Sequence, residues 1–426
     1  MDEKNTTKIT SEDLRRAFEG DAAAKPAAQH NPVDNKPSHK PLKKKLMIFN
    51  IVGGISLAAG VICLLLAFLV FAPNKSGVEY PEIPSKTSSD NVYSMLTGEI
   101  LADKSQVTAP AYCVQMPNGT DGARPQAGLN QAGVVFEAIA EAGITRFAAV
   151  YQNPDSTIIG PVRSLRIYYL QWDTPFDCTI VHAGGSGDAL AAVSSGGYKD
   201  LSEDYNYMYR GTYGGRLWNN LFTTTEELKQ FSVDHNDDSS DIKGFARLTP
   251  AESEQQRADK SVKEKLDITK ATTENTSAVD VPVPSVALNL GGWADFNVNY
   301  NYDAETNTYL RSYESGNVHQ VYNCTDGGLD NRNPEDVCTL GQVAPAVVVA
   351  MMVQESRAAD NYHEDITAIG SGKAYIFQNG TAIEANWNKA SAEDQIKFTD
   401  SGGKEVKLAP GQTFITAVPN YGSVDF

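Results

Sequence analysis

Four side chains that could bind an anion or move a proton lie within one 45-residue stretch, from Gly143 to Gly187. They are Arg146, Arg163, Arg166 and His182, and the sequence around them is mostly apolar. Guanidinium groups present N–H donors in a geometry that suits phosphate and carboxylate oxygens. A histidine beside them could exchange a proton near neutral pH. The stretch therefore predicts a pocket for an anion and leaves a reaction open.

The residues that follow Gly160 are expected to open a helix over 162–170. Pro161 suits the first helical position, because its missing N–H would have no partner there anyway. Arg163 and Arg166 would then lie one turn apart on the same face. Two cations near a helix N-terminus oppose the helix dipole, at roughly 0.3–1 kcal/mol each, and a bound anion would reverse that penalty.

A glycine-rich turn comes after the strand expected at 179–183. Gly184, Gly185 and Gly187 permit positive φ angles, with which backbone N–H groups can form an anion nest, and Ser186 opens the next helix. The spacing lacks the third glycine of a dinucleotide fingerprint and the second glycine of a nucleophile elbow. The turn therefore extends the predicted pocket without indicating a nucleotide cofactor.

Glu137 and Glu141 are the weak candidates for catalysis. They lie four residues apart, so they share a face whether the segment is a strand or a helix. A buried glutamic acid could serve as general acid with His182 as its proton partner. Alternatively, either carboxylate could pair with Arg163 or Arg166 in a purely structural network. No set of nucleophile, base and orienting group can be read from the sequence, so binding is favoured and enzymatic activity stays open.

The elements that must position these residues alternate between strands and helices, which indicates an α/β domain over residues 95–250. A polar connection over 251–284 leads to a β-rich (α+β) domain over 285–420, with a hairpin turning near Asp303–Asn307 and hairpins again over 396–418. The individual segments expected are strands at 134–139, 144–152, 179–183, 345–353 and 373–378, and helices at 162–170, 188–194 and 225–231.

The N-terminal part predicts a single membrane-spanning helix. Leu46 to Ala72 is an uncharged apolar run of 27 residues, longer than the ~20 residues needed to cross a bilayer. Lys43, Lys44 and Lys45 place the preceding tail, residues 1–45, in the cytoplasm. That tail has few large apolar residues and is expected to be disordered. A linker over 73–94 would then lead to domains on the extracytoplasmic side of the cell membrane.

Charge limits the possible partners of the extracytoplasmic part. The first 45 residues hold 10 of the 36 Lys/Arg and 7 of the 53 Asp/Glu, so the rest carries a net charge of −20. Such a chain is not expected to bind nucleic acid, which attracts proteins through clustered cations. The positive charge of the arginines in the opening stretch is therefore opposite to the net charge of this part of the chain.

Four cysteines follow the predicted span: Cys113, Cys178, Cys324 and Cys338. An exported protein can form disulfides, and four cysteines allow three pairings. A bridge between Cys324 and Cys338 would close a 13-residue loop and stabilise the fold by about 3 kcal/mol. No C-x-x-C pair occurs, so a zinc site is not indicated, and we expect neither a metal nor a cofactor.

Several successive motifs resemble those of the YerB-like family, bacterial cell-envelope proteins of unknown function. They are Ala123 to Gln152, IGPVRSLR, FDCTIVHAGGSGDAL, Trp218 to Lys229, Gly380 to Lys389 and LAPGQT. The resemblance covers about residues 95–250 and 285–420 and implies two exported domains. By position, it places the polar motif residues of the family on Arg124, Glu137, Glu141, Arg146, Arg163, Arg166, His182, Asn220 and Thr223.

Two features depart from the family pattern. Many relatives are lipoproteins held by a lipidated cysteine, whereas Cys63 lies in the middle of the apolar run after Val61 and Ile62. Asn219 also stands where the family carries a histidine, which argues against a mechanism that needs a histidine there. We therefore expect a single-pass envelope protein that binds or scaffolds an anionic cell-wall polymer or an envelope protein. The alternative is an envelope glycan hydrolase or lyase that uses Glu137 or Glu141 with His182.

Overall fold

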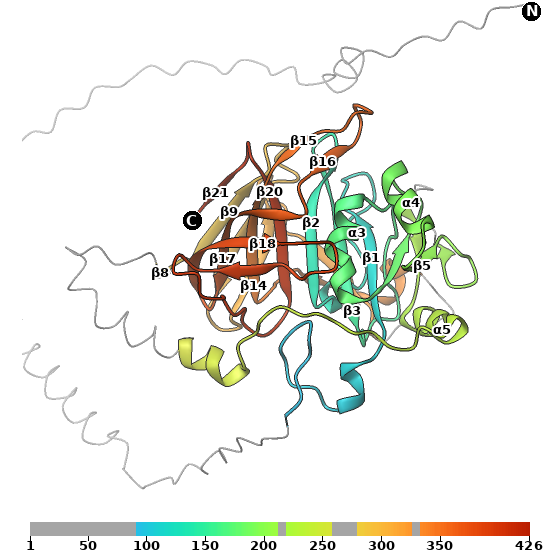
Figure 1. Cartoon of the computed structure of the whole chain (residues 1–426), viewed down its shortest axis with the longest axis horizontal. Helices are drawn as coiled ribbons and strands as arrows, with labels where there is room; N and C mark the ends of the chain where they lie inside the picture. The colour runs from blue at the N-terminus through green and yellow to red at the C-terminus, as the bar shows by residue number, and fades with distance from the viewer. Residues whose placement is uncertain (1–90, 212–218, 258–278, 326–332) are drawn as a thin grey trace, which may run out of the picture. The chain divides into compact units, whose positions relative to one another are not determined.

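One large mixed β-sheet runs through the folded part of the chain (Figure 1). The computed structural model describes residues 91–211, 219–257, 279–325 and 333–426. These residues all belong to one compact unit. The predicted tail and membrane span lie outside the described residues. Among the helices that the structure does describe, none has the length and apolar character of a membrane span.

The large sheet has eleven strands, and the order along its main path is β19-β18-β17-β14-β20-β2-β3-β1-β4-β5, with β8 paired to β18. Their bounds are β1 Ala111–Pro117, β2 Val134–Glu141, β3 Ile144–Gln152, β4 Thr179–His182, β5 Lys199–Ser202, β8 Val279–Pro282, β14 Val347–Val353, β17 Gly370–Gln378, β18 Thr381–Lys389, β19 Lys397–Thr399 and β20 Thr413–Pro419. The helices are short: α3 Ile167–Asp173, α4 Gly187–Ser194, α5 Thr225–His235 and α7 Pro334–Val337, with 3-10 turns η1 Lys104–Val107, η2 Leu129–Gln131 and η3 Thr174–Phe176. Residues 250–257 are helical as well. The fold is thus mixed α/β with a dominant sheet.

Smaller sheets flank this large one. A four-stranded sheet has the order β11-β10-β9-β21, and three two-stranded sheets pair β12 with β13, β15 with β16 and β6 with β7. The bounds are β6 Tyr209–Arg210, β7 Leu221–Phe222, β9 Ser285–Asn289, β10 Val298–Asp303, β11 Thr308–Tyr313, β12 Gln320–Asn323, β13 Thr339–Gln342, β15 Glu355–Arg357, β16 Glu364–Ile366 and β21 Ser423–Asp425. The predicted turn near 303–307 therefore joins β10 to β11.

The central strands are apolar because both of their faces are covered. Strands β1, β14 and β20 are almost wholly buried along their length. On one face, Phe136 of β2 stacks on Trp172 of α3, with the ring centroids 5.4 Å apart. On the other face, Phe147 of β3 packs against Phe414 of β20. Two apolar layers thus lie on opposite sides of the same strands.

Strand β20 occupies a central place that the sequence did not indicate. It pairs in parallel with β14 and with β2, so that Val134 lies opposite Thr413. Of the hairpins predicted over 396–418, only a short antiparallel turn between 398 and 406 forms. Strand β19 otherwise pairs with β18, and the last long strand crosses to the middle of the sheet. Strands from before residue 250 and after residue 285 share one sheet in consequence.

The helix predicted over 162–170 begins later than expected. Residues 161–166 are extended, Arg166 is the N-cap of α3, and the helix runs from Ile167 to Asp173. The extended backbone is held by neighbouring segments, since the N–H of Arg163 donates to the carbonyl of Gln115 at 2.7 Å. These long-range bonds outweigh the local preference for a helix start after proline. Arg163 and Arg166 therefore do not share a helix face.

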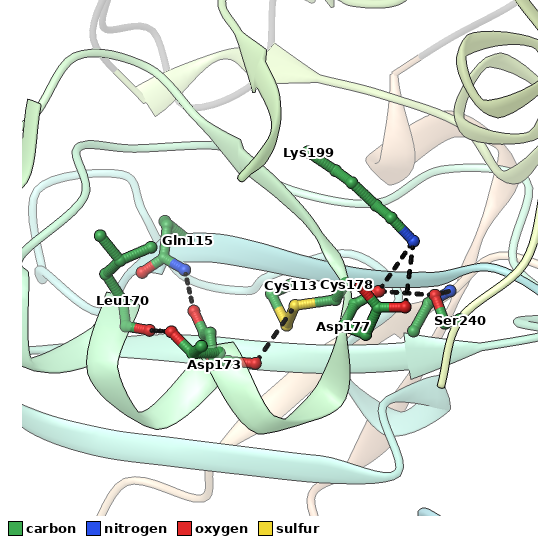
Figure 2. The surroundings of a disulfide bond; sticks show 10 residues. Cys113, Gln115, Leu170, Asp173, Asp177, Cys178, Lys199 and Ser240 are labelled. Atoms are coloured by element: carbon green, nitrogen blue, oxygen red, sulfur yellow. Dashed lines mark hydrogen bonds and ion pairs between the residues drawn. A yellow bond between two sulfur atoms is a disulfide. The ribbon is translucent and has the colours of Figure 1, made fainter. Parts of the chain in front are cut away.

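Two disulfides form among the four cysteines, which resolves the three pairings that the sequence left open. Cys113 of β1 is bonded to Cys178, at the start of β4, with 5.7 Å between Cα atoms (Figure 2). The other bridge joins Cys324 to Cys338. Figure 2 also shows Asp173, near the first bridge, directed toward Gln115 on β1. The first disulfide thus fixes two neighbouring parallel strands next to the predicted site.

Candidate functional site

The centre of the candidate site is Arg163, which lies where two parallel strands end. Its backbone joins them: the N–H bonds to Gln115 of β1, and the carbonyl accepts from the N–H of Ala183 after β4, at 3.0 Å. Carboxyl ends of parallel strands are where α/β sheets commonly place ligands. The guanidinium is half-buried, and its Nε is buried without a hydrogen-bond partner. Within the described residues, its side chain makes no ion pair.

The charges around Arg163 are mixed. Burial, followed by the neighbouring Arg146, lowers the pKa of Arg163, while Asp121 and Glu141 favour its charged form. Arg210 is a further cation close enough to disfavour that charge. It reaches the site from β6, and its Nη1 donates to Oδ1 of Asn220 at 3.0 Å. An anion bound at Arg163 would therefore meet two further guanidinium groups, Arg146 and Arg210, and two carboxylates, Asp121 and Glu141.

Arg146 and Arg166 share one carboxylate. Glu141 accepts from Nη2 of Arg166 at 2.8 Å and from Nη2 of Arg146, and all three side chains are largely buried. Arg146 also donates to the carbonyl of Ser164, at 3.0 Å. Two cations on one anion leave the group with an excess positive charge. The three side chains nevertheless bond to one another. They are therefore better placed to hold the surroundings of Arg163 in position than to contact a ligand themselves.

Glu137 belongs to a separate network on the other face of the sheet. Both of its carboxylate oxygens accept from Nη2 of Arg311, at 2.8 and 2.9 Å, and both side chains are fully buried. Thr145 donates to Oε1 at 3.0 Å and Thr416 to Oε2 at 3.3 Å. Burial alone would lower the pKa of Arg311, but the Glu137 carboxylate, together with Tyr300 and Tyr313, outweighs it and raises that pKa. This arrangement is that of a structural ion pair.

The prediction that Glu137 and Glu141 share a face is wrong. The pairing of β2 with β3 shifts register between Ile139 and Glu141, as a β-bulge does. Glu137 stands opposite Phe147, on the face where Arg311 of β11 lies. Glu141 instead reaches Arg146, which stands opposite Ala138 on the face that carries α3. One inserted residue therefore directs the two carboxylates to different sides of the sheet.

His182 is a hydrogen-bonded structural residue. Its side chain is buried, Nδ1 lies 2.7 Å from the carbonyl of Gly184, and Nε2 lies 2.9 Å from Oδ1 of Asp200 on β5. Both ring nitrogens thus have partners within the fold. A proton relay from His182 to Glu137 or Glu141 finds no support in these contacts. The histidine instead orients the turn after β4.

The glycine turn has only part of the predicted geometry. Gly184 has a positive φ of 68°, whereas Gly185 and Gly187 do not, so the expected three-glycine nest is wrong. Gly185 approaches the extended 161–166 segment, because a Cβ there would lie 3.2 Å from the carbonyl of Leu165. Ser186 is the N-cap of α4 but makes no capping bond, and its Oγ is buried without a partner.

Asn220 and Thr223 hold the chain beside this site. Asn220 donates through Nδ2 to the carbonyl of Gly211 at 2.8 Å, and Thr223 donates through Oγ1 to the carbonyl of Tyr207 at 2.8 Å. Asn219, at the position of the family histidine, is buried and donates to Asp121 at 3.3 Å. The three residues thus position the loops that surround Arg163.

Sequence reasoning missed Arg311, His319 and Arg210. An arginine at a buried position of an alternating strand, as in TYLRSY, was the available signal for Arg311. His319 lies 3.1 Å from Nη1 of Arg311, and burial, then the charges of Arg311 and Arg124, hold its pKa well below the usual value. Arg124 donates to Oδ1 of Asn118 at 2.8 Å, so it belongs to the buried network and not to the Arg163 site.

Comparisons with known proteins agree with this two-part organisation of the sequence. Residues 96–239 match the family described as "Protein of unknown function (DUF3048) N-terminal domain", and residues 288–415 match the corresponding C-terminal domain. A curated relative, "Putative lipoprotein YerB" of Bacillus subtilis (strain 168), is 28% identical over 360 residues, 84% of this chain and 94% of that protein. The crystal structure of YerB protein from Bacillus subtilis aligns with a TM-score of 0.61 and 22% identity, over 79% of this chain and 100% of that one.

Proposed function

Because this chain belongs to the YerB-like family, matched by both of its domains, we propose that it is a membrane-anchored envelope protein that binds an anionic envelope ligand at Arg163. The ligand class is a phosphate or carboxylate group of a cell-wall polymer. The anchor is the apolar run 46–72, with the N-terminus in the cytoplasm and residues 95–420 outside.

Two observations support the extracytoplasmic location. The described residues contain two disulfides, and such bonds persist mainly in oxidising compartments. The Bacillus relative is described as a lipoprotein, which is also a membrane-attached class. In this chain an uncharged membrane-spanning helix would anchor the protein instead of a lipid. The folded part would be tethered in either case.

The observation that carries the binding proposal is the Nε of Arg163, which is buried without a hydrogen-bond partner. A buried N–H without a partner costs about 1–3 kcal/mol, which a ligand oxygen would recover. Charge-assisted bonds from arginine to phosphate or carboxylate are among the stronger hydrogen bonds in proteins. Arg146 and Arg210 lie near enough to act on the charge of Arg163. A monovalent or divalent anion would therefore lower the energy of the whole group.

The ion triad of Glu141, Arg146 and Arg166 would act as support in this proposal. Its two ion pairs fix Arg146 beside Arg163. The positive charge of Arg146 is therefore already in position before a ligand binds. Replacement of Arg166 would break a buried pair and unfold the site. Arg163 alone is therefore the residue to change in a binding test.

The test compares Arg163→Ala with Lys404→Ala, since each removes one positive charge. Lys404 is exposed in the turn after β19, at the far edge of the sheet from β5. Binding of the purified protein to isolated wall polymer is measured by co-sedimentation at low and high salt. We expect Arg163→Ala to lose about tenfold in affinity, the effect of one charge-assisted bond, and Lys404→Ala to bind as wild type. Equal binding by wild type and Arg163→Ala would refute the proposal.

A further inference from the structure

A second concave site lies among residues that the arginine site does not use. A cavity of about 480 Å³ is bounded by Trp293, Tyr421, Arg357 and Glu364, and we call it the Trp293 cleft. Trp293 follows β9, Tyr421 lies between β20 and β21, and the two charged residues come from the β15–β16 hairpin (Figure 1). The volume falls within the range of about 300–1,000 Å³ typical of small-molecule sites.

Two aromatic rings at this cleft are exposed to solvent. Trp293 is 66% exposed and Tyr421 58% exposed, although large aromatic side chains are usually well covered. Exposed aromatic groups around a concavity commonly mark a binding site. More than half of the surface of each side chain is therefore available for contact with a partner.

Glycines hold the two rings against the backbone. A Cβ at Gly291 would lie 2.4 Å from the ring of Tyr421, and one at Gly143 would lie 3.4 Å from the ring of Trp293. Both glycines have positive φ angles, +72° and +80°, that other residues rarely adopt. Tyr421 is also fixed at its other end, where its hydroxyl donates to Oε1 of Glu355 at 2.6 Å. Exposure here is thus combined with a defined ring position.

The polar groups of the cleft suit hydroxyl groups better than an anion. Glu364 is only 9% exposed, and its Oε1 lies 3.6 Å from Nη2 of Arg357. Just behind Tyr421, Glu355 is 7% exposed, and its Oε2 is buried with no hydrogen-bond partner. Burial, and then the neighbouring Glu364, raises the pKa of Glu355 to about 7 although the Tyr421 hydroxyl opposes this. Carboxylates in this position would repel a phosphate or carboxylate ligand.

We propose that the Trp293 cleft binds a carbohydrate chain. One pyranose ring would lie on the face of Trp293, because the C–H groups of a sugar carry partial positive charge that matches the negative face of an aromatic ring. Hydroxyls of the sugar would donate to Glu364 and accept from Arg357, which together offer both kinds of partner. Tyr421 would cover the neighbouring ring of the chain.

A protein partner is the competing occupant, and the shape of the site disfavours it. Protein interfaces of standard size bury about 800 Å² on each side, with anchors near the centre of an extended surface. The Trp293 cleft is a small concavity with a buried carboxylate in its wall. This site differs from Arg163 in its residues and its ligand chemistry, so the inference does not depend on the proposed anion binding.

The experiment titrates the full-length chain, in a detergent without a sugar headgroup, with three neutral tetrasaccharides: chitotetraose, cellotetraose and maltotetraose. Calorimetry is expected to show saturable binding of at least one. Trp293→Ala should weaken it by about tenfold, the effect of one lost stacking contact, and Glu364→Gln should weaken it without unfolding the protein. Trp293→Phe, which keeps a smaller ring, should fall between wild type and Trp293→Ala.

Tyr205→Ala is the matched control, because Tyr205 is 59% exposed but follows β5 at one edge of the sheet, away from the β2–β3 turn that lines the cleft. It should bind as wild type. The proposal is overturned if no tetrasaccharide binds at millimolar concentration, or if Trp293→Ala binds as tightly as wild type. Loss of a cross-link to an envelope protein in Trp293→Ala, with no sugar bound by wild type, would also overturn it and identify a protein-docking site.

Discussion

Removal of Arg311 tests whether Glu137 is a structural residue. In Arg311→Met the Glu137 carboxylate would keep its neutral donors, Thr145 and Thr416, and lose both bonds to a cation. No water could replace the guanidinium easily, because both side chains have 0% exposure. We therefore expect a large loss of folding stability and no specific loss of ligand binding.

The magnitude follows from the burial of this pair. A charge left alone after one partner of a buried ion pair is removed costs about 3–5 kcal/mol. Glu137→Gln should cost a similar amount, since a neutral amide would leave the buried Arg311 charge without its counter-ion, and His319 at 3.1 Å brings no negative charge. In the double variant neither charge remains. Its cost should then fall to about 1–3 kcal/mol, set by the neutral groups that lose hydrogen bonds.

Urea unfolding of residues 87–426 at pH 7, followed by tryptophan fluorescence, measures these three variants against wild type. The sum of the single losses should exceed the loss in the double variant by about 3 kcal/mol or more. Additive losses would show that the two groups do not stabilise each other, and would refute the interpretation of a structural pair. If Glu137→Gln is as stable as wild type but has lost ligand binding or activity, Glu137 has a functional role and not a structural one.

Two further changes test the same fold. Burial raises the pKa of Asp173 to about 8 from 3.8, so wild-type stability should fall as the pH rises through that interval. Asp173→Asn should remove this decline, and its free energy of unfolding in urea at pH 9 should exceed that of wild type by about 2 kcal/mol or more. Parallel plots of unfolding free energy against pH for the two proteins would contradict this. Cys113→Ser with Cys178→Ser opens a bridge of sequence separation 65 and should cost about 4 kcal/mol, measured likewise; an unchanged midpoint would contradict it.

Strands with strong apolar patterns could be predicted from the sequence alone. Strand β3 has the predicted bounds, 144–152, and β14 begins within two residues of the predicted start at 345. Helix α5 begins at Thr225 as expected, because Thr224 caps it by accepting from the N–H of Glu227. These features depend on neighbours within a few positions, which a sequence shows directly.

The details of the site depend on distant contacts that the sequence does not show. Arg163 is extended because Gln115, almost fifty positions earlier, offers a carbonyl to its N–H. The two glutamates separate because one residue bulges out of β2. Arg311 was overlooked because its partner is 174 positions away. The structural alternative from the sequence, a glutamate paired with Arg166, does occur, since Glu141 accepts from both Arg166 and Arg146.

The central place of β20 has a consequence for biosynthesis. A ribosome delivers β2 early and β20 among the last residues of the chain, yet the two are hydrogen-bonded neighbours. Until β20 arrives, that edge of β2 offers unpaired backbone groups to other chains. The growing protein is therefore vulnerable to aggregation until β20 has been made. A stop codon ahead of Thr413 would remove β20 from between β2 and β14 in the middle of the sheet.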